Sequence, residues 1–193
     1  MLALPFVPKA TPVLRGERIT LRLPHARDYA QWSALRRASR AFLEPWEPLW
    51  AVNELDRSGW RVRLDRNRTE FKAGSGIGFL LVDHVEDQIL GGITVGNIRM
   101  GVAQTCQIGY WMGQPYAGRG YMGDALKLVI PFAFGELRLH RIEAACIPSN
   151  ARSVRVLEKA GFTREGLARS YLRINGAWQD HFLYGLVCDD ARR

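Results

Sequence analysis

The chain has 193 residues, of which 47% are apolar and 24% charged, which is the composition of an ordinary globular protein. No apolar run approaches the roughly 20 residues that span a bilayer, and the proline-interrupted N-terminus lacks a signal-peptide pattern, so we expect a cytoplasmic protein. The three cysteines have no metal-ligand spacing, so we expect no metal site. The net charge of +8 predicts a surface that attracts anions, such as a phosphorylated ligand, an acidic peptide or nucleic acid.

The first part of the chain predicts an arm, a strand and two helices. Residues 1–17 are interrupted by prolines and are expected to form an extended N-terminal arm that precedes one folded domain, residues 18–193. Apolar residues alternate over residues 18–23, which is the pattern of a half-buried strand. Helices are expected over residues 28–38 and 53–72.

An aromatic segment lies between those two helices. Residues 42–50 carry Phe42, Trp46 and Trp50 together with prolines, which forbid a regular helix. Such a loop either folds over a core or lines a pocket. Asn53, just beyond it, is a candidate N-cap for the second helix.

The second part of the chain predicts a sheet of mixed strand direction. Short links join the strands expected over residues 79–82, 89–98 and 104–112, so these strands should be antiparallel. Asn175-Gly176 is a strong hairpin signal for the last two strands. Strands are expected over residues 79–82, 89–98, 104–112, 141–147, 162–174 and 177–187, and helices over residues 121–134 and 150–160. The order β-α-α-β-β-β-α-β-α-β-β predicts a single-domain α/β fold whose mixed parallel and antiparallel central sheet has helices on both faces.

A glycine-rich turn between a strand and a helix carries the strongest chemical signal. Gly118, Gly120 and Gly123 open the helix that follows. Glycines let the backbone approach an anion, and the unpaired N–H groups of the first helical turn point at it, assisted by the helix dipole. The turn therefore predicts a phosphate-binding loop, although a glycine turn without a ligand is the alternative when it is considered alone.

The same glycines form the pattern GxGxxG, which is typical of dinucleotide-binding folds. The loop before Gly118 is longer than the tight turn of that fingerprint, and the strand that ends at Ile147 has no acidic residue at its tip for a ribose. Too little chain follows for a doubly wound domain. We therefore do not expect a nicotinamide enzyme.

The glycine turn also resembles the pyrophosphate loop of the GCN5-related N-acetyltransferase (GNAT) family, whose pattern is Gln/Arg-x-x-Gly-x-Gly/Ala. Gly120 matches the central glycine, whereas Ala117 and Met122 depart from the pattern. Asn150-Ala151-Arg152-Ser153, followed by Gly161-Phe162, resembles the next block of the family.

Further segments resemble the branch of this family that acetylates the N-terminal alanine of ribosomal proteins. They are Phe42-Leu43-Glu44-Pro45-Trp46 near the start and residues 166–172 and 175–181 near the end. The resemblance covers approximately residues 18–187.

The resemblance implies acetyl-coenzyme A (acetyl-CoA) as the cosubstrate, lying where a splayed strand pair opens the sheet. It implies that a backbone N–H near Trp111 or Met112 polarises the thioester carbonyl, while the side chains of Tyr110 and Trp111 are expected to pack in the core. The residues expected to bind the cofactor are Trp111, Met112, Gly118, Arg119, Gly120, Tyr121, Met122, Gly123, Asn150 and Ser153.

The implied reaction is direct attack of a neutral amine on the thioester, which requires a proton donor for the departing thiolate. Many family members use a tyrosine, but the matching residue here is Leu157. Ser153 is expected to take this role, and the alternative is a hydroxyl that bonds its own helix backbone. Asn150 is expected both to cap that helix and to contact the cofactor.

The sequence offers several candidates for the group that accepts the proton of the amine. Glu44 and Glu47 flank Trp46 in the aromatic segment that should border the acceptor site, so either is a candidate. Glu143 and Asp180 stay open as alternatives. Positioning, with deprotonation through water, is the simplest alternative.

The branch resemblance and the basic surface predict that the acceptor is the α-amine of a protein N-terminus, approached beside ribosomal RNA. A small amine, such as an antibiotic, a polyamine or an amino acid, is an alternative within the same chemistry. A non-catalytic module that binds acyl-CoA or an RNA-rich partner is the alternative from another class, and Leu157 keeps it open. A homodimer that orders the N-terminal arm also stays open.

Overall fold

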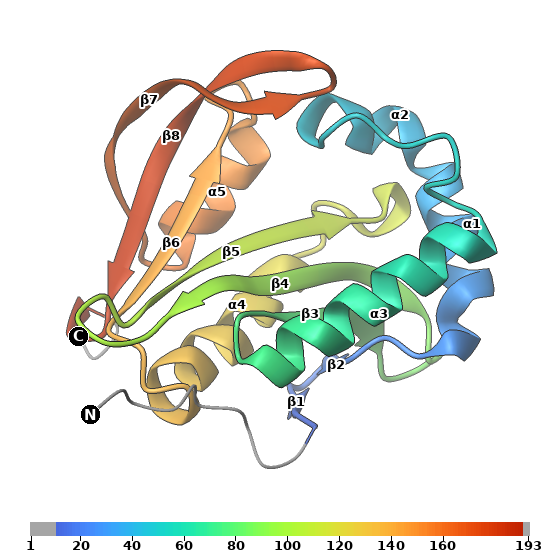
Figure 1. Ribbon diagram of the computed structural model, residues 1–193, viewed down its shortest axis with the longest axis horizontal. Helices are drawn as coiled ribbons and strands as arrows, with labels where there is room; N and C mark the ends of the chain where they lie inside the picture. Colours follow the sequence, from blue (N-terminus) through green and yellow to red (C-terminus); the bar gives the residue numbers. More distant parts are fainter. Residues whose placement is uncertain (1–10, 191–193) are drawn as a thin grey trace.

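One eight-stranded sheet organises the chain in the computed structural model, which describes residues 11–190 (Figure 1). Its order is β1-β2-β3-β4-β5-β6-β8-β7, and every neighbouring pair is antiparallel except β5 and β6, which are parallel. The strands are β1 (Val13–Arg15), β2 (Ile19–Arg22), β3 (Ile77–Asp83), β4 (Ile89–Arg99), β5 (Thr105–Met112), β6 (Arg141–Cys146), β7 (Thr163–Ile174) and β8 (Ala177–Val187). The predicted mixed sheet is therefore confirmed.

Helices cover both faces of this sheet, as expected, with α1 and α3 on one face and α4 on the other (Figure 1). The helices are α1 (Tyr29–Ala38), α2 (Arg40–Leu43), α3 (Arg57–Ala73), α4 (Tyr121–Pro131) and α5 (Ala151–Lys159). Asn53 is not the N-cap of α3, because residues 53–56 form a turn in which the Asp56 N–H bonds the Asn53 carbonyl at 3.1 Å. The cap position is Asp56.

The two faces of the sheet have separate apolar cores. The larger core lies against α4 and α5 and includes Leu126 and Leu157, which are almost fully buried. The smaller core lies under α1 and α3 and consists of Trp32, Trp60, Leu64, Leu80, Val82 and Ile89. Each large apolar side chain buried in this way contributes about 1.5–3 kcal/mol to folding.

The predicted N-terminal arm is only partly described. Residues 1–10 lie outside the described residues, whereas Val13–Arg15 forms β1, which pairs with β2 at the edge of the sheet. The domain boundary at residue 18 stays a prediction. Within residues 11–190, no helix is both long and apolar enough to cross a bilayer.

The parallel strands β5 and β6 separate part-way along their length. Their pairing runs from Thr105 with Arg141 to Ile108 with Ala144 and stops there, although β5 continues to Met112. The outer edges stay paired, since β4 follows β5 to Met112 and β8 follows β6 to Cys146. The sheet is therefore open between residues 109–112 of β5 and the end of β6, as Figure 1 shows.

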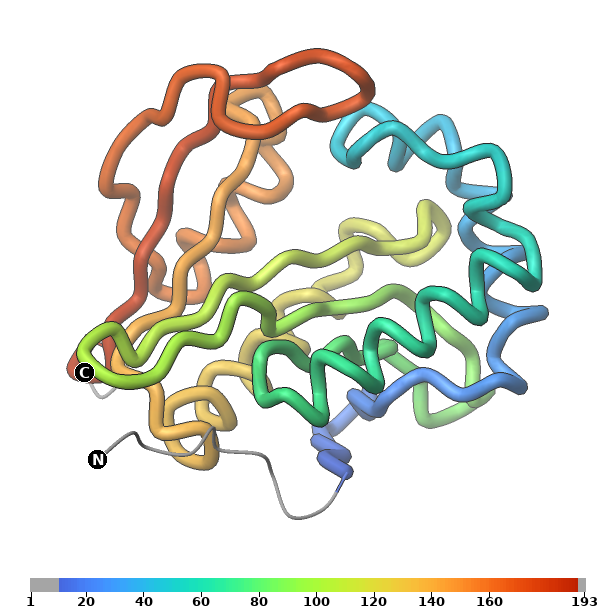
Figure 2. Tube along the Cα trace, in the orientation of Figure 1, coloured from blue at the N-terminus to red at the C-terminus, as the bar shows by residue number. Residues whose placement is uncertain are grey.

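The hairpin of β7 and β8 reaches across to the aromatic segment near the start of the chain. Its turn residues Asn175 and Gly176 have φ values of 44° and 82°, which is the turn that the Asn-Gly pair predicts. The Asn175 N–H donates to the Glu47 carbonyl at 2.8 Å. In Figure 2 the hairpin tip lies beside α2, so two segments far apart in sequence meet at one end of the opening.

Candidate active site

The opening between β5 and β6 exposes main-chain groups at the end of β5. The Gly113 N–H donates to the Leu90 carbonyl on β4 at 2.8 Å. Successive N–H groups of an extended strand point to opposite sides, so the Met112 N–H points away from β4 and toward the opening. Of the two sequence candidates, Met112 rather than Trp111 therefore has the orientation that an oxyanion donor requires.

The glycine loop presents a set of free N–H groups at the start of α4. Its first helical hydrogen bond joins the Asp124 N–H to the Gly120 carbonyl at 3.1 Å, so the N–H groups of residues 120–123 precede any helical acceptor. Gly118 and Gly120 have φ values of 78° and 85°, which favour glycine and turn the backbone into this shape.

Open space surrounds this loop. A Cβ atom added at Gly118 or Gly123 would have no neighbouring atom within 4 Å. The loop thus has the room and the donors that a pyrophosphate needs, with the positive end of the α4 dipole behind it. The departures Ala117 and Met122 do not remove this property, because the donors belong to the backbone.

An arginine that the sequence analysis missed supports the loop from the residue directly before β2. The Arg18 Nε donates to the Asp124 carboxylate at 2.8 Å, and the Arg18 guanidinium lies 4.7 Å from the centre of the Tyr121 ring. Arg18 also reaches the Arg119 carbonyl at 3.3 Å. The pairing matters because an unpaired Asp124 in the first turn of α4 would repel a phosphate. Only the folded chain brings these residues together.

Ser153 and Tyr110 meet across the base of the opening. The two hydroxyl oxygens lie 2.8 Å apart. Asn150 caps α5 as predicted, because its side chain accepts the Ser153 N–H at 3.1 Å. The Ser153 hydroxyl thus has a partner on β5 and is held in a fixed position at the N-terminus of α5.

The environment keeps these groups protonated. Burial raises the pKa of Tyr110 well above its usual range, and the hydrogen bond with Ser153 opposes this shift only partly. Burial likewise raises the pKa of Cys146, which ends β6 beside Ser153. Leu157 is 1% exposed and packs in the core. The Tyr110 and Ser153 hydroxyls therefore stay protonated at the opening. Tyr110 packs against the core as expected, and its hydroxyl in addition meets Ser153, which the sequence analysis did not foresee.

The two glutamates of the aromatic segment have cationic partners. Glu44 accepts from the Arg40 Nε at 2.6 Å and keeps 34% of its side chain exposed. Glu47 accepts from both terminal nitrogens of Arg36, at 2.8 and 2.7 Å, and from the Trp50 Nε1 at 2.7 Å. Both oxygens of Glu47 are therefore occupied by structural hydrogen bonds, whereas Glu44 retains contact with solvent.

Arg36 ties the aromatic segment to the end of β5. Its side chain is 5% exposed, and its guanidinium lies 4.4 Å from the Trp50 ring centre and 4.9 Å from that of Trp111. We call Arg36, Glu47, Trp50 and Trp111 the arginine latch. The Trp111 side chain packs against the smaller core, as the sequence predicted, and in addition joins this latch. Such buried, multiply bonded ion pairs hold geometry even where their net contribution to stability is small.

The other acidic candidates lie away from the opening. Glu143 pairs with Arg141 at 3.1 Å and with Arg99 at 3.5 Å, on the closed part of the β5–β6 pair. The Asp180 carboxylate accepts the Ser170 N–H at 2.8 Å within the β7–β8 hairpin. The structure therefore does not bring either group to Ser153.

A splayed parallel strand pair beside a glycine-opened helix defines a protein that binds an extended ligand with a phosphate-rich end, as acyl-CoA-dependent transferases do. Comparisons with known proteins agree. The model of the acetyltransferase (GNAT) domain matches residues 18–163. A ribosomal protein uS5-alanine N-acetyltransferase of Escherichia coli is 37% identical over 184 residues, which are 95% of this chain and 94% of the relative.

Two solved structures are similar along nearly the whole chain. Mycobacterium smegmatis RimJ in complex with CoA-disulfide has a TM-score of 0.87 and 32% identity, covering 95% of this chain and 89% of that one. The ribosomal-protein-S5-alanine acetyltransferase of Vibrio fischeri has a TM-score of 0.86 and 34% identity, covering 94% of this chain and 100% of that one. The chain belongs to the GNAT family and is an N-acetyltransferase that uses acetyl-CoA.

Proposed function

We propose that this enzyme acetylates the α-amine of an N-terminal alanine, and that its acceptor is a ribosomal protein of the uS5 type. The 37% identity to the Escherichia coli enzyme, spread over 95% of this chain, carries the proposal. The opening in the sheet supports it, because the aromatic segment and the β7–β8 hairpin, the segments that resemble the N-terminal-alanine branch, meet at one end of that opening.

Acetyl-CoA supplies the acetyl group as an activated thioester. In the proposal, the main chain of residues 118–123 binds its pyrophosphate, and Arg18 neutralises the Asp124 carboxylate nearby through their ion pair. The Met112 N–H stabilises the negative charge that develops on the carbonyl oxygen during attack by the amine, which is the role of an oxyanion donor. Asn150 fixes the first turn of α5 and so positions Ser153.

The pair of Ser153 and Tyr110 is the proposed proton donor to the departing thiolate. Ser153 donates its proton to the thiolate, Tyr110 passes its own proton to the Ser153 oxygen through the 2.8 Å hydrogen bond, and water returns a proton to Tyr110, whose neutral form burial favours by raising its pKa. A positioned acid of this kind contributes about 10²–10⁴ to the rate.

Removal of the proton of the amine is proposed to occur through water. Glu44 is the carboxylate best placed to receive that proton, because it borders the acceptor side and keeps solvent contact. Glu47 is assigned to the arginine latch instead.

The net charge of +8 favours approach to an anionic particle such as the ribosome, and a reaction at the ribosome would take place in the cytoplasm. Because contacts of this kind involve phosphates, the approach would weaken as the salt concentration rises.

A coenzyme A release assay tests the proposal. The acceptor is a short peptide that begins with alanine, compared with the same peptide whose amine is blocked. Release with the free amine alone supports α-amine acetylation. Release with neither peptide, combined with turnover of a polyamine or amino acid, rejects it in favour of a small-amine acetyltransferase.

A further inference from the structure

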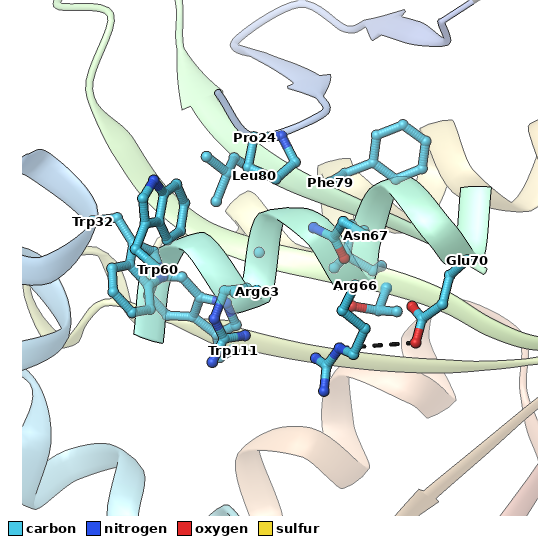
Figure 3. Close-up of a pocket in the computed structure, with 14 residues that line it drawn as sticks. Pro24, Trp32, Trp60, Arg63, Arg66, Asn67, Glu70, Phe79, Leu80 and Trp111 are labelled. Carbon is cyan, nitrogen blue, oxygen red and sulfur yellow. Dashed lines mark ion pairs between the residues drawn. The ribbon is translucent and has the colours of Figure 1, made fainter. Parts of the chain in front are cut away.

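A cavity lies between α3 and the sheet, apart from the glycine loop and from Ser153. Its volume is about 60 Å³, and Figure 3 shows α3 crossing over the strands that line it. The residues that matter here are Arg63, Arg66 and Asn67 on α3, Gly78 on β3, Thr94 on β4 and Trp111 on β5.

The floor of the sheet beside this cavity is built from small residues. Gly78 pairs with Thr94, and Thr94 pairs with Gly109. Residues paired directly across antiparallel strands point to the same face, so these three form one row across β3, β4 and β5. The row carries a single short side chain.

This row begins at the opening in the sheet. Gly109 is the first residue of β5 beyond Ile108, where the pairing with β6 ends. Gly109 is exposed, and a Cβ atom added there would have no neighbour within 4 Å. Thr94 is exposed as well, whereas Gly78 is buried. We call the Gly109–Thr94–Gly78 row the trough: it carries little side-chain bulk between the opening and the cavity under α3, which Thr94 and Gly78 line.

Close contacts require two of these glycines, Gly78 in the trough and Gly92 beside it. A Cβ atom at Gly78 would lie 2.8 Å from the Asn67 Oδ1 atom, and one at Gly92, in the neighbouring row, would lie 2.5 Å from the Trp111 Nε1 atom. The Asn67 amide and the Trp111 indole thus rest directly on the sheet. Trp111 is shared with the arginine latch, which connects the trough to the acceptor side of the opening.

Two polar groups at the trough have no partner within the chain. Among residues 11–190, neither the Asn67 amide nor the Thr94 hydroxyl makes a hydrogen bond with another protein group. The charged side chains nearby are paired, Arg63 with Glu54 and Arg66 with Glu70. A side-chain amide offers the same donor and acceptor pair as a peptide group. The trough therefore suits a neutral main chain rather than a phosphate or an ammonium group.

We propose that the trough and the cavity under α3 form a subsite for the main chain of a peptide acceptor, in which Asn67 bonds a peptide group beyond the reacting residue. This inference rests on the proposed function. Neighbouring strands lie about 4.8 Å apart, so the path from β5 to β3 is about 10 Å, which an extended peptide covers in about three residues.

The subsite predicts a dependence on acceptor length. Alanine amide and alanine-initiated peptide amides of increasing length are compared by the kcat/KM of the wild-type enzyme. The value should rise until about three residues follow the alanine and then level off. In Asn67→Ala the ratio of the kcat/KM for the longest peptide to that for alanine amide should fall about tenfold, mainly through KM.

Two further variants make the test specific. Thr94→Leu places a larger side chain in the trough at an exposed position and should reduce the same ratio. Thr69→Ala changes an exposed residue of α3 and should leave the ratio at the wild-type value, which controls for effects on the helix.

The outcomes separate the two proposals. Peptide acetylation with a length dependence that Asn67→Ala and Thr94→Leu abolish supports the subsite. Peptide acetylation with the same length dependence in all four proteins overturns the subsite and leaves the proposed function intact. Acetylation of small amines but of no peptide overturns both.

Discussion

The two sides of the opening are built from different kinds of groups. The proposed cofactor side consists of the main chain of the glycine loop, whose free N–H groups need no particular side chain. The acceptor side uses side chains that pair over long sequence distances, such as Arg36 with Glu47 and the aromatic rings around them. A main-chain site tolerates the departures Ala117 and Met122, whereas a side-chain site changes with every residue. This difference explains how one fold keeps its cosubstrate while acceptors vary.

The largest expected effect lies where the two sides meet. Ser153→Ala should lower kcat by about 10²–10⁴, because it removes the proposed proton donor to the thiolate. Tyr110→Phe should lower kcat as well, and the double variant should lose less than the product of both, since the two hydroxyls act in one hydrogen-bonded pair. Steady-state kinetics at saturating acetyl-CoA measures this. A Ser153→Ala enzyme with wild-type kcat would remove Ser153 from the mechanism.

The next effect tests whether the acceptor side depends on its latch. Glu47→Gln leaves the buried Arg36 with only the more distant Glu54, at 4.0 Å, as an anionic partner, so the free energy of unfolding should fall by about 3 kcal/mol, the lower end of the range for breaking a buried ion pair. The KM for the peptide acceptor should rise while kcat at low temperature stays close to that of the wild type. Denaturant unfolding and kinetics check this. A large loss of kcat without a loss of stability would make Glu47 the proton acceptor and contradict the latch. Glu44→Gln is the matched comparison in the same segment.

A third change acts on the cofactor side alone. Gly123→Glu adds a carboxylate among the free N–H groups of α4, in open space and without a left-handed backbone, so the affinity for coenzyme A should fall about a hundredfold, or about 2.7 kcal/mol. Gly123→Ala should bind nearly as the wild type does. Calorimetric titration measures both. Gly120 is less suitable, because its φ of 85° would add strain to any substitution. Normal binding by Gly123→Glu would move the phosphate site elsewhere.

The smallest effect concerns pH. Burial raises the pKa of Tyr110, so its stabilising contribution is complete below the ordinary tyrosine pKa of about 10 and is lost as the pH rises through the higher folded value. Phenolate absorbance of the folded protein near pH 10 should therefore be the same in the wild type and in Tyr110→Phe. A smaller phenolate signal in the variant would show that Tyr110 ionises normally and cannot serve as a neutral donor.

The contrast between main-chain and side-chain groups also explains which features the sequence could predict. Gly118, Gly120 and the Asn-Gly hairpin act through local backbone conformation, which a short sequence pattern reveals. The fold class and the N-cap role of Asn150 belong to this kind and are confirmed. Arg18 with Asp124 and Tyr110 with Ser153 are pairs formed by tertiary packing, so no local pattern could reveal them. The start of α3 was misjudged because Asn53 and Asp56 are both good caps and the turn decides between them.

The most direct test of the account is the position of the acetyl group on the product. A peptide that begins with alanine and contains an internal lysine is incubated with the enzyme and acetyl-CoA, and the product is sequenced by tandem mass spectrometry. The account predicts acetylation of the α-amine of alanine and an unmodified lysine. Acetylation of the lysine side chain, or a peptide left unmodified while a small amine is acetylated, would contradict it.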